Sequence, residues 1–251
     1  MAAENTFSRE RVELLNVPVD SIPQDRLTDV VYALLAAGGG QNMVLLSLRD
    51  LLRARRNGEY RSFVLNAALV IPISKSLVGG IRFLTGRTAV RHMPFDFVVN
   101  LLSILEDREF SVYLLGAKRR VLQKTEKNIR QTFPRLRIVG RYSGGFKRQE
   151  EATILEAIRK ASPSLLLVNR GVNGGEQWIV KNSARLGQGL RLWCSDLFEV
   201  FAERKRRPSR KTFDRGLEWM GYCFQNPLKL FRFFPYCYYK LLLLIYRIFK
   251  K

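Results

Sequence analysis

Histidine and cysteine are scarce in this sequence of 251 residues, which has one histidine, His92, and three cysteines. The cysteines are Cys194, Cys223 and Cys237, and their spacing is not that of a metal-binding pair. A zinc site built from cysteine and histidine is therefore nearly excluded. Three cysteines cannot all pair within one chain, which argues against a disulfide framework and favours a reducing compartment. A Ser-His-Asp triad would have to use His92, and a lone histidine beside an arginine is more often a surface or loop residue.

Acidic residues are also scarce. The chain has 22 Asp and Glu residues against 43 Lys and Arg residues, which gives a formal net charge of +21. Such a charge favours anionic partners, and nucleic acid, an anionic membrane face and phosphorylated substrates are the three candidates. The N-terminal segment has no apolar core of the kind found in signal peptides, so we expect a cytoplasmic protein.

The positive charge is concentrated towards the C-terminus. Residues 204–251 contain thirteen Lys and Arg residues but only two acidic residues, Asp214 and Glu218. About a fifth of the chain thus carries about half of the net charge. We therefore divide the chain into a core, residues 1–203, and a basic, aromatic C-terminal appendage, residues 204–251.

Short apolar runs alternate with helical segments in the core. Runs of this length are typical of strands buried on both faces of a parallel sheet, and they occur at residues 42–46, 69–73, 110–115, 136–139, 165–168 and 190–193. Helices are predicted between them at residues 25–37, 117–133 and 149–161. This alternation predicts an α/β fold, with a mainly parallel, Rossmann-like sheet flanked by helices.

Ligands of such sheets bind beyond the carboxyl ends of the strands, where the loops of this chain contain serine, glycine and basic residues. Three loops, residues 116–119, 140–146 and 169–175, combine glycine with a basic side chain. Glycine loops at helix starts expose N–H groups that suit phosphate, although glycines also simply make tight turns. Three such loops at one edge favour a nucleotide or sugar-phosphate pocket. A GxxxxGK[ST] motif is missing, so a Walker-type NTPase is not supported.

The end of the appendage has the pattern of an amphipathic helix. Its sequence is YCYYKLLLLIYRIFKK, residues 236–251, and its longest uncharged apolar run has six residues, far fewer than the roughly 20 that span a bilayer. At about 100° per residue its basic residues share one arc. This pattern predicts a helix that lies in the interface of an anionic membrane. A helix docked on the core, or a homo-oligomer contact, is the alternative. Pro235 is expected to separate this helix from the preceding segment.

Several motifs, in the same order along the chain, resemble the WecG/TagA/CpsF family of bacterial glycosyltransferases. YLLGAK (113–118), FPRLRIVG (133–140) and GF (145–146) are similar to the family's LLGG…YPxLxIVGxxxGYF stretch. LLVNRGVNGGEQWI (166–179) is similar to its LLVGLGxPxQExWI motif. The motifs FDF, RAP, GLEW and EPxRLxRR correspond to FE (198–199), RRP (206–208), GLEW (216–219) and NPLKLFR (226–232). LNVPVD (15–20) and RHMPFD (91–96) resemble the family's opening strand and its RVxGxD segment.

This resemblance implies an α/β glycosyltransferase of the hexosyltransferase type. Such an enzyme moves a sugar, typically an N-acetylhexosamine, from a UDP-sugar donor to a polyprenyl-diphosphate-linked acceptor in cell-surface polysaccharide biosynthesis, without a metal or other cofactor. The implied partners are a nucleotide-sugar donor, a lipid-linked acceptor and the anionic surface of the inner face of the cell membrane. Nucleic acid is not an expected partner, because a helix-turn-helix, RRM or zinc-finger signature is missing.

The resemblance also indicates the site residues. Asp96 and Glu176 are acids at matched positions and are candidates for the base that takes the acceptor's proton. The structural alternatives are a capping residue and a first-turn acid that favours the helix dipole. The donor-binding candidates are Ser47, Ser74, Gly116, Gly145, Phe146, Asn169, Arg170, Gly171 and Trp178. The candidates for the acceptor diphosphate or the membrane are Arg206, Arg207, Arg210, Lys229, Arg232, Lys240 and Arg247. Asp50 and Glu199 are weaker acid candidates.

Some polar positions of the family differ in this chain. The aspartate of the family's LPDG segment, its proposed base, falls on Ile73 or Ser74, and neither of these is a base. Gly175 replaces a glutamine, and Tyr222 replaces an arginine. These changes support an alternative hypothesis: a catalytically degenerate family member that acts as a membrane-associated binding or scaffold subunit.

Overall fold

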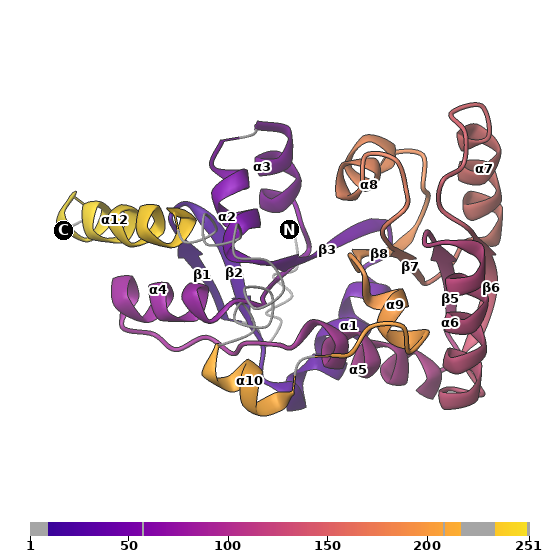
Figure 1. The fold of residues 1–251 in the computed structure, drawn as a ribbon, viewed down its shortest axis with the longest axis horizontal. Helices are drawn as coiled ribbons and strands as arrows, with labels where there is room; N and C mark the ends of the chain where they lie inside the picture. The colour runs from indigo at the N-terminus through magenta and orange to yellow at the C-terminus, as the bar shows by residue number, and fades with distance from the viewer. Residues whose placement is uncertain (1–9, 57, 208, 217–233, 250–251) are drawn as a thin grey trace, which may run out of the picture.

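A parallel sheet of six strands lies at the centre of the computed structural model, which describes residues 10–56, 58–207, 209–216 and 234–249 (Figure 1). The strands are β3 (Gly40–Leu46), β4 (Leu69–Pro72), β5 (Ser111–Leu115), β6 (Arg137–Tyr142), β7 (Leu165–Val168) and β8 (Gly189–Trp193). Their order across the sheet is β4-β3-β8-β7-β5-β6, and every pairing is parallel. The predicted α/β fold with a parallel sheet is confirmed.

Helices cover both faces of this sheet, because its strands are apolar on both sides. In β3, for example, Val44 packs into one buried cluster and Met43 into the other. The Val44 face is covered by α2 (Leu48–Ala54), α3 (Gly58–Leu65), α7 (Glu151–Ala161) and α8 (Glu176–Asn182). The opposite face is covered by α1 (Leu27–Ala36), α5 (Pro94–Asp107), α6 (Arg119–Thr132) and α9 (Leu197–Phe201). A short 3-10 helix, η1 (Gln24–Arg26), leads into α1.

An N-terminal hairpin packs beside β4. Its strands are β1 (Glu10–Leu14) and β2 (Val17–Ser21), and its turn residues Leu15 and Asn16 have φ of 52° and 63°. The fully buried carboxylate of Asp20 accepts hydrogen bonds from Arg11 Nε at 2.7 Å and from the backbone N–H of Val70 at 2.7 Å. One side chain thus ties both hairpin strands to the sheet.

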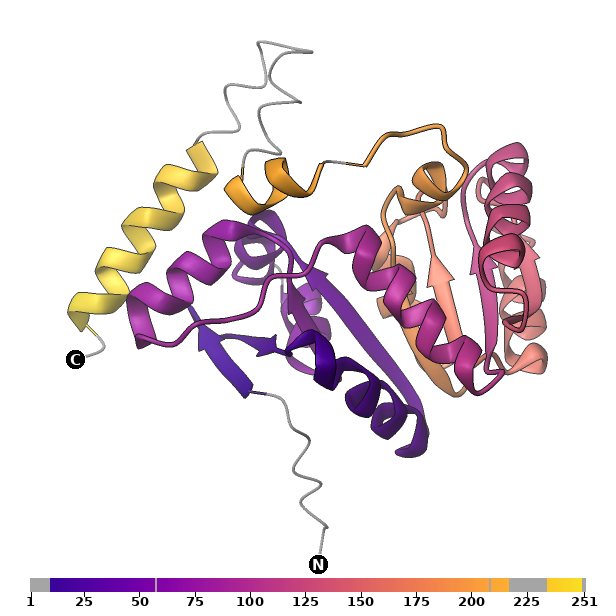
Figure 2. The same cartoon turned by 90° about the horizontal axis from the view of Figure 1, so that it is seen from below.

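The C-terminal helix α12 (Phe234–Phe249) lies beside α4 (Lys75–Thr85), as Figure 2 shows. One face of α12 is buried through Tyr239, Leu242 and Leu243. The Tyr239 hydroxyl donates to the Ser76 carbonyl at 3.0 Å, and a Cβ at Gly80 would collide with that hydroxyl. The helix begins one residue before Pro235, which lies in its first turn, where a missing N–H costs little. Pro235 was expected to separate this helix from the segment 227–234, of which Phe234 is the first residue of α12 and residues 227–233 lie outside the described residues.

The predicted elements differ from the observed ones mainly at their ends. The helix predicted over residues 25–37 is η1 followed by α1, and the one predicted over 117–133 is α6. Strand β6 continues three residues beyond the predicted run, to Tyr142. None of the helices in the described ranges is long and apolar enough to cross a membrane.

Candidate active site

Three glycine-containing loops at the carboxyl edge of the sheet form one hydrogen-bonded cluster. Ala117, after β5, donates its N–H to the Arg170 carbonyl at 2.6 Å. Gly145, after β6, donates to the Gly171 carbonyl at 2.7 Å, and Gly171 follows β7. Gly116 has φ of +113°, and a Cβ there would lie 2.5 Å from the carbonyl oxygen of Asn169. The sequence needs glycine here because the loops approach each other closely.

Most of the N–H groups in this cluster are used within it. Those of Gly116, Ala117 and Gly145 already donate to backbone carbonyls, so the expected phosphate cradle of N–H groups would compete with these bonds. Asn169 is fully buried, and its Oδ1 accepts from the Arg170 N–H at 2.6 Å. Asn169 therefore holds the loop in place. Of the donor-binding candidates in this cluster, the exposed ones are Gly145, Arg170 and Gly171.

Phe146 and Trp178 pack against each other below the loops. Their rings meet edge to face with centroids 6.4 Å apart, and both residues are buried. The pair joins the loop after β6 to helix α8. Both candidates therefore position α8 in this state, and their role in donor binding stays a prediction.

Two further donor-binding candidates, Ser47 and Ser74, stand at neighbouring helix starts. Ser47 caps α2: its Oγ accepts the Asp50 N–H at 3.3 Å, and the Asp50 carboxylate accepts the Ser47 N–H at 3.0 Å. Ser74 precedes α4, and its Oγ accepts the N–H of Leu48 at 3.2 Å. Two helix N-termini thus lie side by side after β3 and β4, an arrangement that favours an anion.

Glu176 lies in a partly buried cluster of charged and polar side chains. It opens α8, its side chain is 10 % exposed, and its Oε2 is 3.8 Å from Nη1 of Arg53 on α2. The Arg53 guanidinium lies over the ring of Tyr60, on α3, at 4.2 Å from its centroid. Sequence reasoning missed Arg53 and Tyr60. Both are more than a hundred residues from Glu176 in the chain, and no local motif marks them.

Burial raises the pKa of Glu176 to about 7. The charge of Asp50 raises this pKa further, whereas the Tyr60 hydroxyl and Arg53 lower it. Burial also raises the pKa of Asp50, against the opposing effect of its hydrogen bonds with Ser47. A carboxyl group with a pKa near neutrality, at the ligand-binding edge of the sheet, is suited to proton transfer.

Asp96, the other candidate base, is in a different environment. It lies in the first turn of α5 without capping it, and its side chain is 44 % exposed. Its Oδ1 is 3.4 Å from Nη1 of Arg207, which also lies over the ring of Phe95. The structure thus brings one candidate base together with one candidate for diphosphate binding.

The start of the appendage is anchored near Ser74. Arg210 begins helix α10 (Arg210–Arg215). The Arg91 guanidinium donates to the Phe213 carbonyl at 2.7 Å and stacks on the Phe213 ring. Lys75 Nζ donates to the Asp214 carbonyl at 3.1 Å. Basic residues of the core therefore hold α10 over the start of α4. Arg206 is exposed just before it, whereas Lys229, Arg232 and Tyr222 lie outside the described residues.

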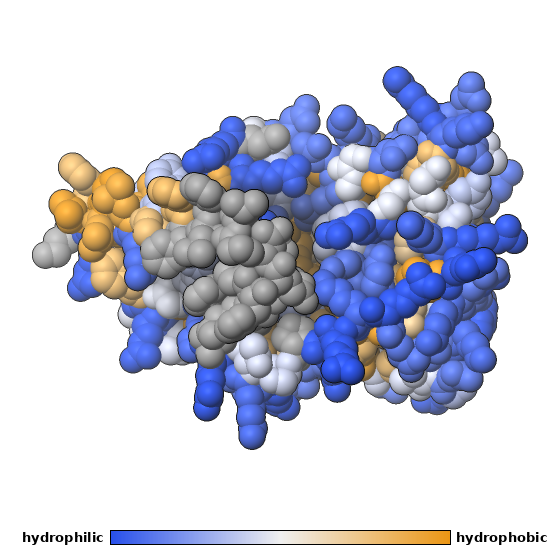
Figure 3. Space-filling model, in the orientation of Figure 1, coloured by the Kyte–Doolittle hydropathy of each residue, from blue (hydrophilic) through white to orange (hydrophobic). Residues whose placement is uncertain are grey.

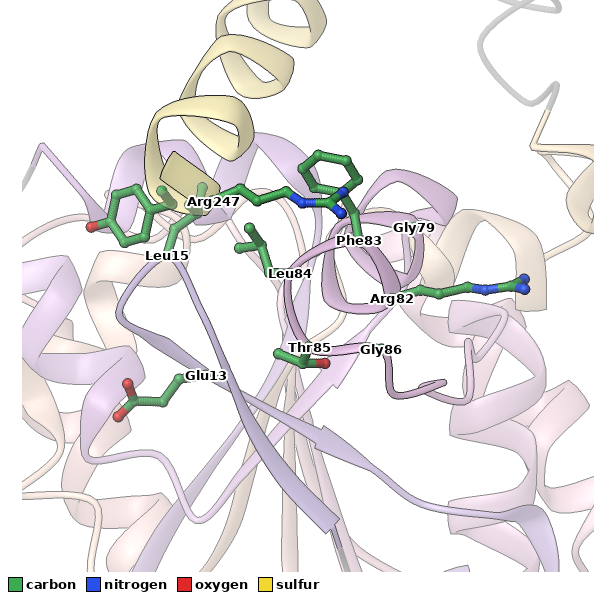
Figure 4. A pocket seen from close by; sticks show the side chains of 10 residues that line it. Glu13, Leu15, Gly79, Arg82, Phe83, Leu84, Thr85, Gly86 and Arg247 are labelled. Atoms are coloured by element: carbon green, nitrogen blue, oxygen red, sulfur yellow. The ribbon is translucent and has the colours of Figure 1, made fainter. Parts of the chain in front are cut away.

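A cavity of about 780 Å³ lies between the β1–β2 hairpin, α4 and α12 (Figure 4). Arg247 lines it, with its guanidinium 4.5 Å from the centroid of the Phe83 ring. Figure 4 shows Arg82 pointing away from Arg247. Arg247 therefore secures α12 to α4 in this state, while Lys240, on the same helix, is exposed.

Comparison with known proteins adds a family and named relatives. The sequence model of the glycosyl transferase WecG/TagA/CpsF family matches residues 12–251 of this chain. A Bacillus spizizenii protein is 23 % identical over 176 residues, which cover 70 % of this chain and 68 % of the relative. A Staphylococcus aureus protein is 19 % identical over 222 residues, which cover 88 % of this chain and 87 % of the relative. Both relatives are named N-acetylglucosaminyldiphosphoundecaprenol N-acetyl-beta-D-mannosaminyltransferase.

Proposed function

Because this chain belongs to the WecG/TagA/CpsF family of glycosyl transferases, we propose that it moves an N-acetylhexosamine-type sugar from a UDP-sugar to a polyprenyl-diphosphate-linked acceptor. The names of the relatives support the acceptor class, since they describe transfer to an N-acetylglucosaminyl-diphosphoundecaprenol. The observation that carries a catalytic role is the buried Glu176 at the edge of the sheet, beside Arg53 and Tyr60.

In this proposal Glu176 is the general base. Its carboxylate takes the proton of the acceptor hydroxyl while the hydroxyl oxygen forms a bond to the anomeric carbon of the donor sugar. The bond from that carbon to the UDP oxygen breaks, and the diphosphate leaves with the electron pair. Cationic side chains stabilise the charge on the leaving group, and Arg170, Arg206, Arg207 and Arg210 are the candidates in the described ranges. The sequence of events needs no metal ion.

Arg53 and Asp50 set the protonation of the base. The positive charge of Arg53 favours the carboxylate form of Glu176, whereas the charge of Asp50 favours the protonated form. Their opposition leaves Glu176 able to accept a proton near neutral pH and to release it afterwards. Both are positioning residues that act through Glu176.

We also propose that residues 204–251 attach the core, residues 1–203, to the inner face of the cell membrane as a peripheral protein. The outer face of α12 exposes large apolar side chains, namely Phe234, Tyr238, Leu241, Leu244, Ile245, Ile248 and Phe249. Figure 3 shows this apolar surface at one end of the molecule. An exposed apolar helix face with nearby cations is typical of helices that lie in the membrane interface.

The test uses the full chain, vesicles that contain a polyprenyl-diphosphate-linked N-acetylglucosamine, and a panel of UDP-N-acetylhexosamines. We expect release of UDP and a lipid product that is heavier by one N-acetylhexosamine, both detected by mass spectrometry. Glu176→Gln should lower the rate of product formation by about 10²–10⁴-fold. Glu109→Gln, at an exposed acid in the turn between α5 and β5, should not lower it. No turnover with any donor, combined with no donor binding by calorimetry, would overturn the proposal.

The degenerate-member hypothesis rests on the missing aspartate at residue 73 or 74 and on Gly175, which replaces a glutamine. Ser74 stands beside the N-terminus of α2, so an acid at this place would face the same helix starts as a bound anion. If this hypothesis is right, calorimetry detects donor binding without turnover, and Ser74→Asp or Ile73→Asp produces turnover that the parent lacks. Turnover by the unaltered chain would contradict the degenerate-member hypothesis.

A further inference from the structure

The strand at the middle of the sheet ends on a tryptophan. Trp193 is the last residue of β8, which lies between β3 and β7. Its side chain packs against the cluster on the Val44 face, whereas α9, the helix that follows β8, covers the opposite face. Because α9 does not cover the ring, Trp193 is only half-buried. An aromatic ring is therefore accessible at the edge of the sheet where ligands of this fold bind.

This ring lies against the start of α8. A Cβ at Gly175, which has φ of +58°, would lie 3.7 Å from both Cη2 and Cζ2 of Trp193. The next residue is Glu176, whose Oε2 is 3.8 Å from Nη1 of Arg53. The indole ring therefore touches the backbone immediately before the proposed base, on the face of the sheet that carries the base and Arg53.

The other tryptophan in the described ranges has no such free surface. Trp178 is 3 % exposed, and its ring packs against Phe146. Trp193 lies between the matched motifs at residues 166–179 and 198–199, so no motif marks it as a site residue. Of the two rings, Trp193 is thus the one that a ligand can contact.

The surroundings of Trp193 suit a pyranose ring. The C–H groups of such a sugar form an apolar face, and an indole offers a large, rigid apolar surface of matching size. The hydroxyl groups at the rim of the sugar need hydrogen-bond acceptors and donors, which the Glu176 carboxylate and the Arg53 guanidinium supply. An apolar surface with a few convergent polar groups is the usual composition of a small-molecule site.

We propose that Trp193 is the surface on which the N-acetylhexosamine ring of the acceptor packs while its hydroxyl faces Glu176. This inference rests on the proposed function, in which Glu176 takes the proton of that hydroxyl. A base must lie within hydrogen-bond reach of the proton that it takes, so the sugar beside Glu176 is the acceptor's. The donor sugar and the uracil ring are the competing occupants, and the test below distinguishes them.

The kinetic test uses the full chain, a UDP-N-acetylhexosamine and a soluble acceptor, farnesyl-diphosphate-linked N-acetylglucosamine. Trp193→Leu keeps an apolar contact with the core but removes the ring. We expect KM for the acceptor to rise about tenfold, with kcat and the donor KM unchanged. Trp193→Tyr should restore most of the affinity. Tyr32→Leu removes a half-buried ring on the opposite face of the sheet and should behave like the parent. No rise in KM for the acceptor in Trp193→Leu, or a rise confined to the donor KM, overturns the proposal.

A binding measurement without donor separates this inference from the proposed function. The chain has three tryptophans, and their fluorescence should change saturably as the soluble acceptor is added. Trp193→Phe, which keeps an aromatic ring in the core, should still bind the acceptor by calorimetry but lose most of the fluorescence change. A change that persists in Trp193→Phe, or no acceptor binding by the parent, overturns the proposal.

The two measurements together separate the two failures. A fluorescence change that depends on Trp193, in a chain without turnover, supports the sugar-binding role of Trp193 although the proposed function fails. Turnover with parent-like kinetics in Trp193→Leu supports the proposed function and overturns the role of Trp193.

Discussion

Arg53 connects Glu176 to Tyr60: its guanidinium is 3.8 Å from the carboxylate and 4.2 Å from the centroid of the ring. Helices α2, α3 and α8 therefore meet at one charged group, at the edge of the sheet where ligands of this fold bind. The contact keeps a positive charge near Glu176 although Asp50 lies in the same cluster.

The stability of the protein should fall as pH rises from about 4.5 to about 7. The pKa of Glu176 is about 7 in the folded protein, above its ordinary 4.5, so the folded state binds this proton more tightly than the unfolded chain. Below pH 4.5 this proton contributes its full effect to the free energy of unfolding. Above pH 7 the contribution is gone, and the free energy of unfolding is lower by about 3 kcal/mol. Glu176→Gln should remove this dependence and be the more stable protein at pH 8. Urea unfolding at pH 5 and pH 8 measures the free energy of unfolding of the parent and of Glu176→Gln at each pH. Glu109→Gln is the control and should behave like the parent.

The pH dependence of activity should respond to the two neighbours of Glu176 in opposite directions. A general base must be deprotonated, so kcat/KM should rise with pH around 7. Asp50→Asn removes a negative charge, lowers the pKa of Glu176 and moves this rise to lower pH. Arg53→Met raises the pKa and moves the rise to higher pH. Glu176→Gln should lower kcat by about 10²–10⁴-fold at every pH. Shifts of the same sign in both variants would contradict the assigned base.

Asp96 should matter less than Glu176 for turnover. Its ion pair with Arg207 is exposed at both ends, so Asp96→Asn should change the free energy of unfolding by less than about 1 kcal/mol. We expect kcat to fall by less than tenfold, because the base is elsewhere. Parallel kinetics of Asp96→Asn and Glu176→Gln decide between the two acids. If kcat falls further in Asp96→Asn than in Glu176→Gln, Asp96 is the base and Glu176 is not.

Two adjacent glycines of α4 should give opposite results. Gly80→Ala would force the buried Tyr239 hydroxyl away and release α12 from the core. Gly79→Ala meets no atom within 4 Å and should stabilise the helix by about 0.4–1 kcal/mol. Hydrogen exchange of residues 234–249 is the readout: fast exchange is expected in Gly80→Ala and parent-like exchange in Gly79→Ala. Unchanged exchange in both variants would mean that Tyr239 does not hold α12.

The outer face of α12 should determine binding to vesicles. Leu241→Glu combined with Ile248→Glu replaces two exposed apolar side chains, each worth about 1.5–3 kcal/mol when buried. Sedimentation with vesicles rich in phosphatidylglycerol should show at least 100-fold weaker binding. Leu65→Glu makes the same exchange at an exposed leucine of α3 and should bind like the parent. Equal binding by all three proteins would mean that another surface contacts the lipid.

The sequence predicted the strands of the six-stranded sheet well because their signal is local, whereas the β1–β2 hairpin is not among the predicted apolar runs. The run Leu165–Val168, for example, is apolar throughout and forms a strand with the predicted bounds. Helix α4 was not predicted, since Gly79 and Gly80 each cost about 1 kcal/mol in a helix. Tertiary packing outweighs this cost, because Gly80 leaves the space that Tyr239 occupies.

The candidate site could be predicted only in part, for a similar reason. The resemblance to a family placed Glu176 at the start of a helix, where the structure has it. Its partners Arg53 and Tyr60 come from distant helices, and only the folded sheet brings them close. Asn169 is a polar residue in a loop at the ligand-binding edge of the sheet, where an exposed side chain is expected. It is buried because its loop packs against the loop after β5.

The position of β8 has a consequence for synthesis of the chain. This strand is the last of the six along the sequence, yet it lies between β3 and β7. A ribosome-bound chain that ends before Gly189 can form the β3–β4 pair and the β5–β6–β7 group, but it leaves an open edge on each. Both edges stay available for wrong pairing until five residues, Gly189–Trp193, emerge and join them. The nascent protein therefore depends on a late segment to become a single sheet.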